Sequence, residues 1–218
     1  FHAAGGTGAL FTALLDAGLM HADAKTCFGN GFGDFCQEPT LIDGQIEWRS
    51  AAATSLDPEI LTTPAMPFAP NGGVKLLEGN LGRSVIKTSA VQEQHYIIEA
   101  PAVVIDDQDD LKPLFEAGEL DKDCVVVVRF QGPAANGMPE LHKLTPMLGV
   151  LQDRGHKVAL VTDGRMSGAS GKVPAAIHLV PEASQGGPLG IIQTGDVIRL
   201  DATTGELSAH IDETELKS

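Results

Sequence analysis

The pattern of apolar and polar positions changes at a proline- and glycine-rich stretch, residues 58–73, which we interpret as a linker or domain boundary. Before this stretch, residues 8–18 place leucine and phenylalanine on one helical face and end in glycine, which predicts a helix. An Asp-Gly dipeptide within residues 41–48 predicts a hairpin. Residues 26–40 have no clear period, so we expect a loop there.

After the stretch, apolar runs rich in β-branched residues alternate with amphipathic segments. The runs at 124–130 and 157–162 are almost wholly apolar, the composition of strands buried on both faces. Pro146 is expected to bend a helix at 139–153. The other predicted elements are a helix at 109–118 and strands at 74–77, 84–88, 96–105, 190–193, 197–201 and 207–211. The pattern therefore predicts an α/β or α+β fold with a barrel-like sheet.

The acidic composition limits the possible ligands. The chain has 218 residues and a net charge of −14, with 29 acidic and 15 basic side chains and none of the basic clusters that nucleic-acid binding needs. We therefore expect no nucleic-acid partner, and a phosphate or carboxylate ligand needs a local basic pocket. No apolar segment approaches the roughly 20 residues that span a bilayer, so we expect no membrane partner.

The cysteines and the N-terminus bear on the cellular location. An odd count of three cysteines favours a reducing compartment, so we expect a cytoplasmic protein. Cys27 and Cys36 are not spaced like metal-binding cysteines, and Cys124 opens an apolar strand, so we assign no metal to them. The N-terminus has neither a starting methionine nor a signal-peptide layout. We therefore expect a soluble piece of a longer protein.

Residues 161–176 are the richest in candidate chemistry. Glycines, hydroxyl side chains, Arg165 and Lys172 follow a buried strand there, a composition that can form an anion-binding turn. The segment matches neither the phosphate-binding loop nor the Gly-x-Ser-x-Gly nucleophile pattern. Ser167 is the candidate catalytic hydroxyl. The alternative is that Ser167 and Ser170 only hydrogen-bond the backbone of their own turn.

Two further loops carry polar side chains at strand ends: residues 71–83, followed by Lys87, and residues 131–140. In such sheets, ligands collect at the carboxyl ends of strands. Since 131–140 and 161–176 both follow buried strands, we expect them to share an edge of the sheet. Glu140 is expected in the first turn of a helix, either as a partner of the helix dipole or as a ligand of a hard cation.

Several motifs, in the same order along the whole chain, resemble those of the dihydroxyacid and sugar-acid dehydratases. These motifs are Gly79-Asn-Leu81 with Lys87-Thr88, Gln131-Gly-Pro with Gly137-Met-Pro-Glu140, Thr162-Asp-Gly-Arg-Met-Ser-Gly168, and Ile177-His-Leu-Val-Pro-Glu-Ala183. Similarity to the branch that acts on 6-phosphogluconate is carried by His2-Ala-Ala-Gly-Gly6, Lys87-Thr-Ser-Ala-Val91, Asn136-Gly-Met-Pro-Glu-Leu-His142 and Ser167-Gly-Ala-Ser-Gly-Lys-Val-Pro174.

The resemblance implies a fold and an activity. Residues 63–218 would form the family's C-terminal swivelling, β-barrel-like domain with flanking helices. Residues 1–62 would be the end of the N-terminal α/β domain that carries the iron–sulfur centre. The implied reaction is that of a hydro-lyase, the loss of water from 6-phospho-D-gluconate to give 2-keto-3-deoxy-6-phosphogluconate in the Entner–Doudoroff pathway. The full-length enzyme is expected to be a homodimer.

The resemblance also implies cofactors. Such enzymes use an iron–sulfur cluster as a Lewis acid on the leaving 3-hydroxyl, and many also bind Mg²⁺. The family's base serine falls on Ser167, and its metal-associated glutamate falls on Glu140. The family's cluster-binding cysteines lie before residue 1, and Cys27, Cys36 and Cys124 do not match them. The chain is therefore expected to lack the cluster ligands and to be inactive on its own.

The substrate-binding residues are a separate expectation. For the 6-phosphate we infer Lys172 and Ser170, since phosphate binding suits a glycine-rich turn with a lysine. Arg165, Asn80 and Lys87 complete the set expected to contact the substrate. Two alternatives stay open: a dehydratase of another sugar acid or dihydroxyacid, and a ligand-binding module with this fold and no catalysis.

Overall fold

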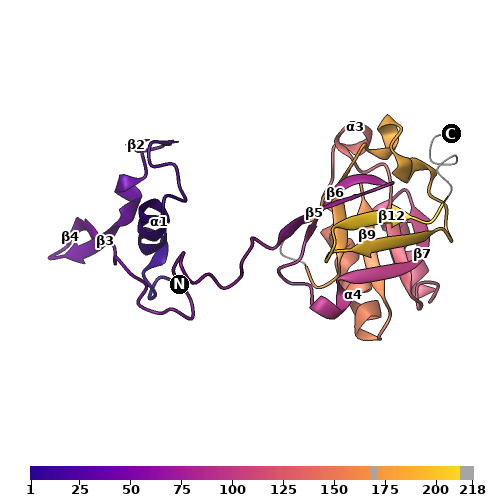
Figure 1. Ribbon diagram of the computed structural model, residues 1–218, viewed down its shortest axis with the longest axis horizontal. Helices are drawn as coiled ribbons and strands as arrows, with labels where there is room; N and C mark the ends of the chain where they lie inside the picture. Colours follow the sequence, from indigo (N-terminus) through magenta and orange to yellow (C-terminus); the bar gives the residue numbers. More distant parts are fainter. Residues whose placement is uncertain (168–170, 212–218) are drawn as a thin grey trace. The chain divides into compact units, whose positions relative to one another are not determined.

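The computed structural model of the protein describes residues 1–167 and 171–211. It divides into two compact units, Phe1–Pro70 and Asn71–Ser218 (Figure 1). The division lies inside the predicted proline- and glycine-rich stretch, somewhat after the boundary at residue 62 that the resemblance implies. No helix within these described ranges is both long and apolar enough to cross a membrane.

The first unit consists of one helix and two small antiparallel sheets. Its elements are α1 (Gly6–Asp16), β1 (Lys25–Thr26), β2 (Gly29–Asn30), the 3-10 helix η1 (Gly33–Cys36), β3 (Gln37–Ile42) and β4 (Gln45–Ser50). The predicted helix is confirmed, and Gly18 after it has a φ of 68°, which glycine adopts without strain. The predicted loop at 26–40 is wrong in part, because β1, β2, η1 and the start of β3 lie there.

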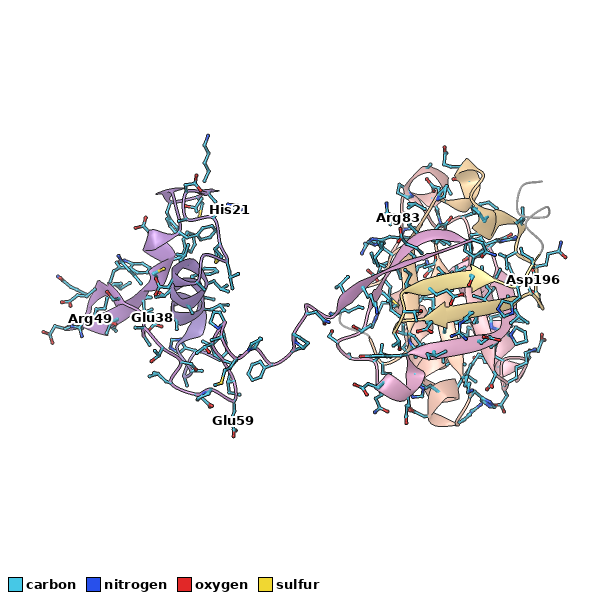
Figure 2. The ribbon with its side chains drawn as sticks, in the orientation of Figure 1. His21, Glu38, Arg49, Glu59, Arg83 and Asp196 are labelled. Atoms are coloured by element: carbon cyan, nitrogen blue, oxygen red, sulfur yellow. The ribbon has the colours of Figure 1, made fainter. Side chains whose placement is uncertain are left out.

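The β3–β4 hairpin confirms the turn prediction. Asp43 and Gly44 have φ values of 50° and 79°, the left-handed conformation that a two-residue hairpin turn requires at both central positions. The strands extend beyond the predicted range, and Glu38 lies opposite Arg49 in their register (Figure 2).

The second unit is built around a closed barrel of mixed strand directions. Around the barrel the strand order is β10-β6-β5-β12-β11-β7-β8-β9. The strands are β5 (Val74–Gly79), β6 (Gly82–Lys87), β7 (Ile97–Ile105), β8 (Cys124–Val128), β9 (Val158–Thr162), β10 (Ala175–Val180), β11 (Val197–Asp201) and β12 (Glu206–Ala209). The prediction of a barrel-like sheet with flanking helices is confirmed.

Four successive strands determine where the candidate site lies. β7, β8, β9 and β10 pair in parallel, so their carboxyl ends lie at the same end of the barrel. The loops predicted to carry chemistry, 131–140 and 161–176, follow β8 and β9. They therefore start at one edge, as the sequence predicts.

β8 and β9 separate two apolar cores. Every residue of both strands is buried. Val125 and Val127 point into the barrel with Ala159 and Val161, and their neighbours Val126 and Leu160 pack with helical leucines outside it. This alternation explains why both runs are almost wholly apolar, and it confirms the prediction of strands buried on both faces.

The helices of the second unit pack against the two apolar cores. They are α2 (Leu111–Glu116), α3 (Pro133–Asn136), α4 (Thr145–Asp153) and the 3-10 helices η2 (Glu93–His95), η3 (Gln108–Asp110), η4 (His142–Leu144), η5 (Ala183–Gln185) and η6 (Pro188–Ile191). Leu111 of α2 and Leu148 and Leu151 of α4 pack in the outer core. Ala183 of η5 and Leu189 of η6 belong to the inner core.

Two predictions in the second unit are corrected by the structure, and one strand was not predicted. Pro146 does not bend a helix: it lies in the first turn of α4, where proline needs no amide donor. The strand predicted at 190–193 is wrong, because Pro188 starts the 3-10 helix η6. Strand β10 was not predicted, because a bulge near His178, with a φ of 57°, interrupts its apolar pattern.

Candidate functional site

The loops after β8 and β9 are joined at the carboxyl end of the barrel strands. Glu140 and Arg165 form a parallel bridge, and the amide of Leu141 donates to the carbonyl of Arg165 at 3.2 Å. Nε of Arg165 donates to the carbonyl of Met138 at 3.1 Å. The expectation that the two loops share an edge of the sheet is therefore confirmed.

The Glu140 carboxylate holds the segment that contains Ser167. Oε2 accepts a 2.7 Å hydrogen bond from Nη1 of Arg165. Oε1 accepts from the backbone amides of Ser167 at 2.7 Å and His142 at 3.0 Å. Glu140 does not lie in the first turn of a helix, as we expected, because η4 begins only at His142. Its carboxylate is placed by Arg165 and Ser167 from the loop after β9 and by the nearby amide of His142.

Ser167 and Lys87 line the same crevice on the outside of the barrel. Lys87 ends β6, and Ser167 lies in the loop that follows β9. The other lining residues are Met166, Gly171, Val173, Ala175 and Ile177. The crevice therefore combines an apolar wall, a hydroxyl group and a cation contributed by two segments far apart in the sequence.

Lys172 lies against a different part of the surface. Its Nζ contacts both carboxylate oxygens of Asp153 on α4, each at 2.7 Å. The side chain crosses Gly149 and lines a groove with His142 and Asp153, not the crevice of Ser167. Ser170, its predicted partner in phosphate binding, lies outside the described residues. The phosphate assignment stays a prediction.

Asn80 links the turn between β5 and β6 to the end of β12. Its Nδ2 donates to the carbonyl of Ala209 at 2.7 Å, and its Oδ1 accepts from the amide of Ala209 at 2.8 Å. The preceding Gly79 lies so close to β12 that a Cβ would be 1.9 Å from the carbonyl oxygen of Leu207. These contacts give the Gly-Asn-Leu motif a structural function, and a contact of Asn80 with substrate stays a prediction.

Sequence reasoning missed the role of a buried carboxylate at this edge of the sheet. Asp163 follows β9 directly and has a relative exposure of 1%. Its Oδ1 accepts from the amide of Gln131, and its Oδ2 from the amide of Ala183, both at 2.9 Å. The signal in the sequence was an ionisable side chain immediately after a buried strand. When such a side chain is buried, it needs hydrogen-bond partners, so its position indicates contacts with neighbouring segments.

The cysteines of this chain do not fit an iron–sulfur cluster. Cys27 is exposed, and the Sγ of the partly buried Cys36 donates to the carbonyl of Phe32 at 3.6 Å. Cys124 belongs to the other unit, and burial raises the pKa of its thiol to about 11, which disfavours the thiolate that binds metal. Among residues 1–167 and 171–211, no three His, Cys, Asp or Glu side chains form a group able to hold a metal ion.

Glu140 alone does not form a metal centre in this arrangement. Both of its carboxylate oxygens already accept hydrogen bonds, from Arg165 and from two backbone amides. A hard cation needs several oxygen ligands, and the described residues form no group of three His, Cys, Asp or Glu side chains that could hold one. We therefore derive no chemical step through a metal held by this chain.

The fold and this site define the class of protein. The family model for the dihydroxy-acid/6-phosphogluconate dehydratase C-terminal domain matches residues 59–218, so the chain belongs to this family. The phosphogluconate dehydratase of Escherichia coli strain K12 is 57% identical over 216 residues, which cover 99% of the chain and 36% of that relative. The phosphogluconate dehydratase of Pseudomonas aeruginosa strain PAO1 is 57% identical over 215 residues, covering 99% and 35%.

A relative from another branch of the family is less similar. The dihydroxy-acid dehydratase of Ignicoccus hospitalis is 36% identical over 218 residues, which cover 98% of the chain and 36% of that relative. The chain thus spans about a third of the length of the curated relatives that it matches.

Proposed function

We propose that the chain is the C-terminal part of a hydro-lyase that converts 6-phospho-D-gluconate to 2-keto-3-deoxy-6-phosphogluconate and water. Its greater similarity to phosphogluconate dehydratases than to a dihydroxy-acid dehydratase supports this substrate. The observation that carries the proposal is structural: Ser167 and Lys87 line one crevice, and Glu140 holds the amide of Ser167.

In the proposed reaction, Ser167 removes the proton from C2 of the substrate. The hydroxyl on C3 leaves with that proton as water, and the enol that remains becomes the 2-keto acid when its O–H proton is lost and C3 takes up a proton. An unaided serine is a weak base, so its alkoxide needs positive charge nearby. The ammonium group of Lys87 supplies such charge in the same crevice. The 2.7 Å bond from the Ser167 amide to Glu140 fixes the backbone at the reacting residue.

The proposal assigns the cofactor to other parts of the enzyme. An iron–sulfur cluster, when bound, supplies Lewis acidity toward the leaving hydroxyl, and Mg²⁺ stabilises negative charge next to the substrate carboxylate. Because Cys27, Cys36 and Cys124 do not fit a cluster, we place its ligands in the length of the relatives that this chain does not span. We also propose that the full-length enzyme is a homodimer and that it is located in the cytoplasm.

A substrate comparison tests the proposed function. The full-length enzyme is assayed on 6-phosphogluconate, gluconate and a branched dihydroxyacid, and the chain alone is assayed on 6-phosphogluconate. We expect the highest kcat/KM for 6-phosphogluconate and no turnover by the chain alone. Preference for gluconate or for the dihydroxyacid would refute the substrate, and turnover by the chain alone would refute the assignment of the cluster ligands. No turnover of any of the three would favour a ligand-binding module.

A further inference from the structure

Asp163 connects three segments at the edge of the barrel that carries the candidate site. Its carboxylate accepts the amides of Gln131, after β8, and Ala183, after β10. The carbonyl of the next residue, Gly164, accepts the amide of His178 in the β10 bulge at 2.8 Å. The two residues after β9 therefore hold the ends of both neighbouring strands.

Close packing reinforces these hydrogen bonds. A Cβ on Gly164 would be 2.7 Å from Cβ of Gln131 and 3.0 Å from Cδ1 of Leu141. The turn after β9 thus lies directly against both ends of the 131–141 segment. Arg165, which binds Glu140, follows this turn without an intervening residue.

The side chain of Gln131 extends the connection to β7. It is 3% exposed, and its Nε2 donates to the carbonyls of Asp106 at 2.7 Å and Arg129 at 3.0 Å. Its Oε1 accepts from Nδ2 of Asn136 at 3.1 Å. The carboxyl ends of β7, β8 and β9 are therefore joined through Gln131 and Asp163.

We propose that Asp163 and Gln131 are the positioning residues of the site: they hold the loops that bring Glu140, Arg165 and Ser167 together. Asp163 does not contact the substrate in this proposal. Both of its oxygens are used as acceptors, so even the isosteric change Asp163→Asn places an NH₂ group against a backbone N–H. A buried donor then loses its partner, and the adjoining loop must move. Displacements of about 1 Å at a reacting group lower turnover about 100-fold.

A matched control separates positioning from general stability. Asp201 is also buried, with 2% exposure, and its Oδ1 accepts the amides of Thr203 and Thr204 at 2.8 and 3.0 Å. It lies opposite Ile97, at the amino end of β7, whereas Asp163 follows the carboxyl end of a strand in the same parallel set. Asp201→Asn therefore makes the same chemical change at the other end of the strands.

The first test measures amide hydrogen exchange in the chain and does not depend on activity. Asp163→Asn is expected to accelerate exchange at the amides of Ser167 and Leu141, which Asp163 does not touch, and Asp201→Asn to leave them unchanged. Acceleration confined to Gln131 and Ala183 would overturn the proposal. Should Asp163→Asn not fold, Gln131→Met decides: faster exchange at Ser167 supports the proposal, and unchanged exchange overturns it.

The second test rests on the proposed function and uses the full-length enzyme. Asp163→Asn is expected to lower kcat for 6-phosphogluconate about 100-fold with little change in KM, and Asp201→Asn to leave both constants unchanged. An equal loss of kcat in the two variants would overturn the positioning role. A wild-type enzyme without turnover would refute the proposed function, while the exchange measurement would still decide the role of Asp163.

Discussion

The backbone amide of Ser167 donates a 2.7 Å hydrogen bond to Oε1 of Glu140, across a separation of 27 residues. The other carboxylate oxygen of Glu140 binds Arg165 at 2.7 Å. One glutamate therefore fixes both the backbone of the candidate base and the arginine two residues before it. This gives Glu140 a function that depends on its charge and on both of its oxygens.

The first prediction concerns the charge of Glu140. In the full-length enzyme, Glu140→Gln is expected to lower kcat about ten- to 100-fold, because an NH₂ group then faces the guanidinium of Arg165 and the Ser167 segment shifts. Steady-state kinetics on 6-phosphogluconate measures this effect.

An exposed ion pair elsewhere on the barrel provides the control. Glu78 binds Nε of Arg83 at 2.9 Å between β5 and β6, and both side chains are exposed. Glu78→Gln is expected to leave kcat unchanged, since exposed pairs contribute about 0–1 kcal/mol. A Glu140→Gln enzyme as active as the Glu78→Gln enzyme would show that the carboxylate of Glu140 is not needed to hold Arg165 and Ser167.

The second prediction concerns close packing after β9. Gly164→Ala places a Cβ 2.7 Å from Cβ of Gln131, so a well-packed segment must shift. Overpacking of this kind lowers the free energy of unfolding by about 1–3 kcal/mol. Urea denaturation of the chain measures the change. Gly72→Ala, where a Cβ has no neighbour within 4 Å, is expected to leave the midpoint almost unchanged; equal midpoints in the two variants would contradict the packing argument.

Much of the fold follows from local sequence patterns. The Asp43-Gly44 turn was predictable because the dipeptide itself adopts the required backbone conformation. β8 was predictable because five consecutive buried residues leave no polar position. β10 was not, because the backbone at His178 is set by its bond to Gly164, and this contact exists only in the folded barrel.

The candidate site was predictable only in part. Two polar loops after buried strands indicated a shared edge, and the Glu140–Arg165 bridge confirms it. The pairing of Lys172 with Asp153 was not predictable, because an ion pair between α4 and a distant loop leaves no local pattern. The burial of Asp163 depends in the same way on amide donors from two other segments.

The third prediction tests Lys172 as a phosphate ligand. Its ion pair with Asp153 is exposed on both sides, so exchange of the carboxylate for a substrate phosphate costs little. In the full-length enzyme, Lys172→Ala is expected to raise KM for 6-phosphogluconate about tenfold, the loss of one charge-assisted hydrogen bond.

Lys143 is the matched control for this experiment, because it forms a similar exposed pair with Asp109. Lys143→Ala is expected to leave KM unchanged. If Lys172→Ala also leaves KM unchanged, Lys172 does not bind the substrate phosphate and only forms its ion pair with Asp153.

The fourth prediction concerns stability in acid. Burial acts to raise the pKa of Asp201, but the amides of Thr204 and Thr203 and the guanidinium of Arg199 lower it below its ordinary value. A lowered folded-state pKa means that the stabilisation is complete above the unfolded value, about 3.9, and is lost as the pH falls through the folded pKa.

We therefore expect Asp201→Asn to destabilise the chain at pH 7 and to reduce the fall of the unfolding free energy below about pH 4. Urea denaturation between pH 7 and pH 3 measures both effects. A parallel pH profile in the variant and the wild type would show that Asp201 does not contribute to acid sensitivity.

The central claim is that Ser167 acts as the base in a dehydration. The most direct test is the kcat of the full-length Ser167→Ala enzyme on 6-phosphogluconate, with cluster content and substrate binding verified to match the wild type. Loss of a general base lowers turnover about 10²- to 10⁴-fold, and we predict a decrease in this range with KM little changed. Unchanged turnover would contradict the claim and leave Ser167 a residue of the turn alone.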